Sequence, residues 1–132
     1  MQTRAILAYL KLLQLFESEV NQLFIILIPF FAAHENSVDA ITCDPTSDRL
    51  FASGSHDKTI KLWDAQKPQK ALNTLTGNKN GIWSLNYSHD GKRLLSASSE
   101  GLCKIWDVKS GKCTTELTAH MGHKVRIYSR NE

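Results

Sequence analysis

Residues 53–64 read SGSHDKTIKLWD, and residues 96–107 read SASSEGLCKIWD. The two segments share serines, a lysine and a closing Trp-Asp pair at matching positions, so that Trp63 and Trp106 lie 43 residues apart. Repetition at a fixed period of ~40–45 residues is typical of chains built from repeated four-stranded units. The sequence therefore predicts a repeat protein with two equivalent units.

Short segments rich in β-branched and aromatic residues fill the rest of each unit. Turn-forming residues separate them at intervals of about 8–12 residues, as in an antiparallel β-meander. Examples are Asp44-Pro45-Thr46-Ser47-Asp48 in the first unit and His89-Asp90-Gly91 in the second. We expect an all-β fold with strands over residues 38–43, 49–54, 58–63 and 70–75, followed by 82–87, 92–98, 101–106 and 112–118.

The pattern resembles the WD-repeat family, whose repeats open near a Gly-His pair and close on Trp-Asp. The openings here are Ala33-His34, Gly77-Asn78 and Ala119-His120, and the closing pairs are Trp63-Asp64 and Trp106-Asp107. The resemblance implies an incomplete WD-type β-propeller, with about two four-stranded blades plus a partial third. The WD-repeat region is then residues 33–132, with repeats of about 33–75 and 76–117 and a truncated third over 118–132.

The resemblance also implies a structural tetrad, a buried hydrogen-bond network of His, Ser, Asp and Trp in each repeat. The matching residues are His34, Ser53, Asp57 and Trp63 in the first repeat, and Asn78, Ser96, Glu100 and Trp106 in the second. We expect a weaker network in the second repeat, because Asn replaces His and Glu is one methylene longer than Asp. Ser, His and Asp are also the residues of a hydrolase triad, but no Gly-x-Ser-x-Gly nucleophile elbow is present, so we expect no catalytic residues.

Partners of related propellers often contact, on the narrow face, the residues that flank the first hydrophobic position of the inner strand and the residue before the turn Asp. The resemblance carries these positions to Ser37, Asp39 and His56 in the first repeat, and to Gly81, Trp83 and Ser99 in the second. Trp83 is the strongest candidate, because Ile82 and Leu85 fill the expected core positions around it and Trp is enriched among binding hot spots. The alternative is that Trp83 packs beneath a neighbouring blade.

Function on this fold resides in surface patches, which predicts a non-enzymatic protein–protein interaction scaffold that binds other proteins and no small-molecule substrate. The alternative is a propeller fragment with no independent activity, because propellers typically have ~4–8 blades. The unpaired strand edges of an incomplete ring also predict self-association. A membrane-tethered adaptor is a third and weaker reading.

The remaining chemistry of the sequence points to no cofactor and no metal. The histidines lack closely spaced cysteine partners, and no glycine-rich phosphate-binding motif is present. Cys43, Cys103 and Cys113 form no Cys-x-x-Cys pair, which favours a reducing compartment, the cytoplasm or the nucleus. The 16 basic residues are scattered without a basic run, so nucleic acid is not an expected partner.

Residues 1–32 form a separate, apolar N-terminal segment. Ile6, Leu10, Leu13, Val20, Phe24 and Leu27 recur at spacings of three, four or seven residues, which predicts an amphipathic helix over about residues 3–25, with Glu17 as a defect in its apolar stripe. Residues 29–32 align with the outer strands of the two repeats, so the segment is expected to end as an outer blade strand. The longest uncharged run, residues 20–33, is shorter than the ~20 apolar residues that span a membrane.

Overall fold

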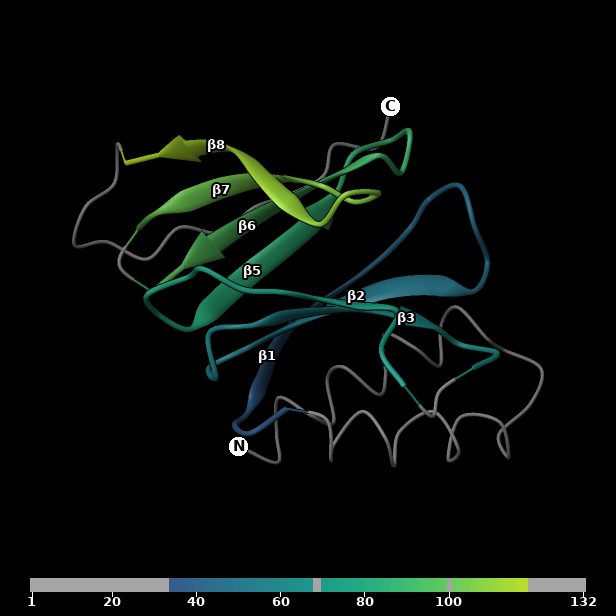
Figure 1. Cartoon of the computed structure of the whole chain (residues 1–132), viewed down its shortest axis with the longest axis horizontal. Helices are drawn as coiled ribbons and strands as arrows, with labels where there is room; N and C mark the ends of the chain where they lie inside the picture. Colours follow the sequence, from purple (N-terminus) through teal and green to yellow (C-terminus); the bar gives the residue numbers. More distant parts are fainter. Residues whose placement is uncertain (1–33, 68–69, 100, 119–132) are drawn as a thin grey trace.

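The computed structural model describes residues 34–67, 70–99 and 101–118, which form two four-stranded antiparallel sheets (Figure 1). Sheet A contains β1 (Val38–Cys43), β2 (Leu50–Ser55), β3 (Ile60–Asp64) and β4 (Asn73–Leu75). Sheet B contains β5 (Ile82–Tyr87), β6 (Arg93–Ser98), β7 (Cys103–Asp107) and β8 (Lys112–Leu117). Each sheet follows sequence order, so the prediction of an all-β fold with two four-stranded units is confirmed.

The strand bounds agree closely with the expected ones, and β1 and β5 match them fully. The main difference is β4, which has three residues where residues 70–75 were expected. Its pairing with β3 runs from Asn73 to Leu75, while the amide of Leu72 still donates to the carbonyl of Leu62 at 2.7 Å. The outer strand of sheet A is therefore short.

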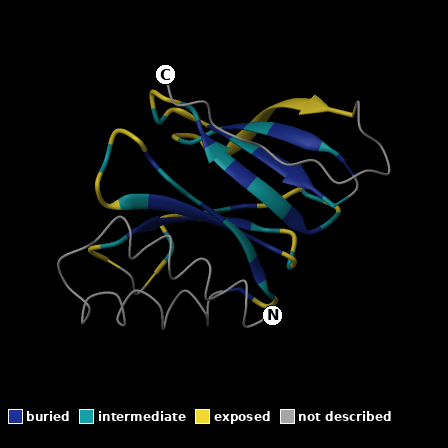
Figure 2. Cartoon of the chain, turned by 180° about the vertical axis from the view of Figure 1, so that it is seen from behind, coloured by how far each residue is buried: buried dark blue, intermediate teal, exposed yellow. Residues whose placement is uncertain are grey.

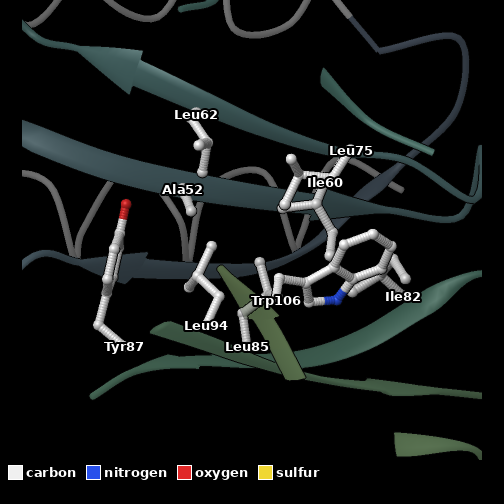
Figure 3. Packing of buried hydrophobic residues seen from close by; sticks show 9 residues of the cluster. All are labelled: Ala52, Ile60, Leu62, Leu75, Ile82, Leu85, Tyr87, Leu94 and Trp106. Atoms are coloured by element: carbon white, nitrogen blue, oxygen red, sulfur yellow. The ribbon is translucent and has the colours of Figure 1, made fainter. Parts of the chain in front are cut away.

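The two sheets pack face to face around one core. Alternation along the strands brings five side chains of sheet B against sheet A: Ile82, Leu85, Tyr87, Leu94 and Trp106. They meet Ala52, Ile60, Leu62 and Leu75 of sheet A (Figure 3). Each large side chain buried in this way contributes about 1.5–3 kcal/mol to folding. The layer between the sheets is consequently the main source of stability among the described residues.

Gly54 of β2 allows the two sheets to approach closely. A Cβ atom at this position would lie 2.5 Å from Cγ2 of Ile82 and 3.0 Å from Cδ1 of Leu85. Both are side chains of β5, the inner strand of sheet B. The absence of a side chain at Gly54 therefore sets how near β5 lies to β2.

Among the described residues, there is no helix that is long and apolar enough to cross a membrane. The predicted N-terminal helix and outer strand, and the start of the third repeat after residue 118, lie outside the described residues. Those expectations remain predictions.

Candidate functional site

A chain of hydrogen bonds joins the four polar residues of the first repeat. The indole Nε1 of Trp63 on β3 donates to Oγ of Ser53 on β2, at 2.8 Å. Oγ of Ser53 lies 2.7 Å from Nε2 of His34, which precedes β1. Nδ1 of the same ring lies 2.9 Å from Oδ2 of Asp57, in the turn between β2 and β3. The network therefore fixes the opening segment, one strand pair and their turn to one another.

The protonation states within this network follow from burial and hydrogen bonding. Burial lowers the pKa of His34 and outweighs the opposing effect of Asp57. Burial raises the pKa of Asp57, but hydrogen bonds from Thr59 and His34 outweigh it, so the pKa is lowered overall. The result is a neutral imidazole beside an ionised carboxylate. Since a carboxylate only accepts, Nδ1 of His34 carries the proton and Nε2 accepts from the Ser53 hydroxyl.

These contacts give Ser53 the role of a structural hydrogen-bonding residue and not that of a nucleophile. Ser53 is 0% exposed, so its hydroxyl has no access to a substrate. The same oxygen accepts from Trp63 while its proton points to His34. A buried and fully satisfied network of this kind holds a blade rigid.

The second repeat has a smaller version of this hydrogen-bond network. Nε1 of Trp106 donates to Oγ of Ser96 at 2.9 Å, as in the first repeat. The Nδ2 of Asn78 is buried and makes no hydrogen bond. Glu100 lies outside the described residues. The Asn side chain thus does not reproduce both contacts of His34.

Lys104 on β7 supplies an anchor that the sequence did not reveal. Its Nζ donates to the carbonyl of Gly77 at 2.8 Å and lies 3.5 Å from Oε2 of Glu116. It also lies 5.8 Å from the centre of the Trp106 ring. Lys61, at the matching position of sheet A, donates to Thr74 instead, at 3.0 Å. The opening segment of the second repeat is therefore held by a lysine, and only the shared Lys61/Lys104 position hinted at it.

The expected binding residues gather at the start of the inner strands, where each inner strand has a bulge. The pairing register shifts between Val38 and Ala40 in β1, and between Ile82 and Ser84 in β5. Asp39 and Trp83 are the residues left out of the regular pairing. A bulge redirects the side chain it carries and is common next to functional sites. The two repeats therefore place Asp39 and Trp83 at equivalent positions.

Backbone contacts connect these two bulges to the other expected residues. The amide of His56 donates to the carbonyl of Ser37 at 2.9 Å, and the amide of Ser99 donates to the carbonyl of Gly81 at 3.0 Å. A Cβ atom at Gly81 would lie 2.7 Å from Nδ1 of His56, so the two repeats touch here. The structure thus brings together a set that we call the narrow-face cluster: Ser37, Asp39, His56, Gly81, Trp83 and Ser99.

The exposure of the narrow-face cluster differs from residue to residue. His56 is exposed, and Gly81 is buried beneath it. Ser37, Asp39, Trp83 and Ser99 are half-buried. The part of the chain that the structure describes contains no group of three or more His, Cys, Asp or Glu residues that would hold a metal ion. Because it combines an indole with carboxylate, imidazole and hydroxyl groups, the cluster offers mixed aromatic and polar contact area.

The buried imidazole predicts a loss of stability in mild acid. Because the pKa of His34 is lowered in the folded state, the unfolded chain takes up a proton more readily as the pH falls below about 6.5. We expect the free energy of unfolding to fall between pH 7.5 and pH 5, measured by urea denaturation. His34→Asn, which copies the second repeat, is expected to flatten this dependence. If the free energy of unfolding falls equally steeply with pH in the wild type and in His34→Asn, His34 is not the group responsible. The lowered pKa of Asp57 affects stability only in stronger acid.

Comparison with known proteins matches the sequence of the two repeats to one family. The family model described as "WD domain, G-beta repeat" matches residues 26–64 and 69–107, and both matches end on the Trp-Asp pairs. The guanine nucleotide-binding protein subunit beta of Oryza sativa subsp. japonica is 30% identical over 101 residues, covering 76% of this chain and 24% of that protein. Cell division control protein 4 of Saccharomyces cerevisiae is 32% identical over 119 residues, covering 90% of this chain and 15% of that protein.

A third relative is pre-mRNA-processing factor 17 of Saccharomyces cerevisiae, 32% identical over 87 residues, which cover 66% of this chain and 19% of that protein. The chain thus spans about a quarter or less of the length of these relatives. The two family matches, in contrast, cover more than half of the chain itself. Together with the two four-stranded sheets, they show that the protein belongs to the WD-repeat family.

Proposed function

We propose that the protein is a non-enzymatic scaffold that binds a protein partner through the narrow-face cluster. WD domains generally mediate protein interactions, and the observation that supports this particular surface is the pair of bulges at Asp39 and Trp83. One bulge carries a carboxylate, whose Oδ1 is buried, and the other carries an indole, on neighbouring inner strands. The contact between His56 and Gly81 makes the two halves of the cluster continuous.

The chemistry of the cluster suits a partner that offers both an apolar group and a hydrogen-bond donor. An indole supplies a large contact area with little conformational entropy to lose, and Trp is enriched among residues that dominate binding energy. The carboxylate of Asp39 accepts hydrogen bonds and attracts cations. Both lie at bulges in strands that are otherwise regularly paired, so the backbone beneath this surface is in place before a partner arrives.

Substitutions at the bulges are expected to weaken partner binding strongly. Trp83→Ala removes the apolar anchor, and a loss of at least ~2 kcal/mol, roughly thirtyfold in affinity, is typical of such a residue. Asp39→Lys reverses the charge beside it. The measurement is the affinity for a partner recovered with the wild-type chain, after circular dichroism has shown that each variant keeps its β signal.

Exposed lysines away from the cluster provide the matched controls. Lys67→Ala and Lys109→Ala remove charges from turns that are exposed. Solvent-exposed charges contribute little to affinity, so both variants are expected to bind nearly as well as the wild type. If the lysine variants lose the partner while Trp83→Ala and Asp39→Lys retain it, binding belongs to another surface.

A second proposal is that the chain acts as part of a larger stack of blades. Leu75 on β4 and Leu117 on β8 hold the same position in their repeats, since each pairs with the first residue of the preceding strand, Ile60 or Cys103. Leu75 is 1% exposed beneath sheet B, but Leu117 is 48% exposed. The outer face of sheet B, which carries Leu95, Ala97, Cys103, Ile105 and Leu117, thus has the pattern of a face made to be covered.

This second proposal predicts that the chain associates through the outer face of sheet B. We expect light scattering after size exclusion to show species larger than a monomer, and Leu117→Asp to shift them towards the monomer. Leu72→Asp is the matched control, because Leu72 is 56% exposed but belongs to the first repeat. A wild-type chain that stays monomeric and unfolds cooperatively would contradict the proposal.

A further inference from the structure

The face of sheet A that points away from sheet B is buried. Register places Ile41 opposite Ser53 and Phe51 opposite Trp63, on the other side of the sheet from the core between the sheets. We call this the outer face of sheet A, defined by Val38, Ile41, Phe51 and Trp63. The four side chains are 5%, 8%, 2% and 3% exposed, and the rings of Phe51 and Trp63 stack at 6.3 Å.

Neighbours within one sheet do not hide large aromatic side chains to this extent, because a sheet face needs a second layer to bury it. The outer face of sheet B shows the contrast. There Ala97 and Cys103 are 0% and 8% exposed, but Leu117 is 48% exposed, and β8 is exposed along its whole length (Figure 2). The described sheets provide no second layer on the outer face of sheet A, so the cover comes from elsewhere.

The kind of cover follows from the repeat itself. Trp106 occupies in sheet B the position that Trp63 occupies in sheet A, and it is buried against sheet A. A preceding blade would bury Trp63 in the same way. The layer over Trp63 is therefore expected to present an apolar surface of comparable extent.

We propose that the apolar stripe of the N-terminal segment covers the outer face of sheet A, in the place of a preceding blade. The described chain begins at His34, whose Nε2 lies 2.7 Å from Oγ of Ser53, and Ser53 belongs to this same face. The segment therefore joins the sheet at the surface that needs a cover. Its stripe of Ile6, Leu10, Leu13, Val20 and Phe24 has the spacing of a helix face that packs on a sheet, with Glu17 as a charged residue within it.

The length of the stripe also suits this face. A helix rises ~1.5 Å per residue, so a stripe from residue 6 to residue 24 extends for roughly 27 Å. A strand of five or six residues is ~17–20 Å long, and neighbouring strands lie ~4.8 Å apart. The stripe is thus long enough to cross the sheet. With sheet A covered in this way, β8 at the edge of sheet B remains exposed among the described residues.

Photo-crosslinking tests the proposal in the full-length chain. The photoreactive residue p-benzoylphenylalanine replaces Phe24 or Leu10, in the stripe, or Gln22, which lies on the opposite side of the predicted helix as the matched control. We expect the Phe24 and Leu10 positions to cross-link to peptides of residues 38–64 of the same chain, several-fold more than the Gln22 position does. Mixing isotopically heavy and light protein distinguishes bonds within a chain from bonds between chains.

Several results would overturn the proposal. Cross-links from the stripe to residues 82–117 would place it on sheet B, and cross-links between heavy and light chains would make a second copy the cover. Reaction only with lipid, in a sample with added phosphatidylcholine vesicles, would assign the stripe to a membrane. Equal yields from Phe24 and Gln22 would show that the segment has no preferred side.

Discussion

Trp106→Ala is expected to lower the free energy of unfolding by about 3–5 kcal/mol, the usual cost of truncating a buried Trp to Ala. Trp106 is 2% exposed and fills the space between the two sheets. Removing it leaves a cavity lined by residues of both sheets and deprives the buried hydroxyl of Ser96 of its hydrogen-bond donor. Urea denaturation followed by circular dichroism measures the loss.

The same substitution at Trp63 and at Trp83 is expected to have different effects on stability. Trp63→Ala is expected to cost a similar amount, because Trp63 is 3% exposed and donates to Ser53. Trp83 is half-buried at a bulge, so Trp83→Ala is expected to cost clearly less stability while it weakens binding. A loss at Trp83 as large as that at Trp106 would contradict its place in the binding surface and favour packing beneath a neighbouring blade.

The sequence predicted the strands well because their signals are local. Short segments rich in β-branched and aromatic residues located β1 and β5, and turn residues located the ends of the hairpins. The 43-residue spacing of Trp63 and Trp106 then made one repeat a guide to the other. The shorter β4 escaped this reasoning, because the length of an outer strand depends on how far its neighbour pairs with it.

The contacts between the repeats were not predictable in the same way. The bulges at Asp39 and Trp83 appear as a shift in pairing, which no pattern in one strand reveals. The close approach at Gly54 depends on where Ile82 lies in the other sheet. Lys104 reaches the carbonyl of Gly77, 27 residues earlier, and that contact exists only once the blade is folded. Each of these features depends on residues far apart in the sequence, whereas the position of a strand depends on residues close together in the sequence.

The two opening residues, His34 and Asn78, are expected to differ sharply in their contribution to stability. His34→Ala removes hydrogen bonds to both Ser53 and Asp57. Since a buried group left without its partner costs ≈ 1–3 kcal/mol, and more when it is charged, we expect a loss of about 3 kcal/mol. Asn78→Ala is expected to cost less than about 1 kcal/mol, because the Nδ2 it removes has no hydrogen bond to lose.

A double-mutant cycle separates the network from simple loss of packing. If His34 acts through Asp57, the substitution His34→Ala is expected to cost much less in an Asp57→Ala background than in the wild type, because the hydrogen bond between the two side chains is already gone. The matching cycle pairs Asn78→Ala with Lys104→Met, since Lys104 anchors the same opening segment through Gly77. Additive losses at His34 and Asp57 would show that the two residues stabilise the blade independently. Coupling in the first repeat, with little loss at Asn78 in the second, would mean that the two blades hold their opening segments by different means: an imidazole in sheet A and an ammonium group in sheet B.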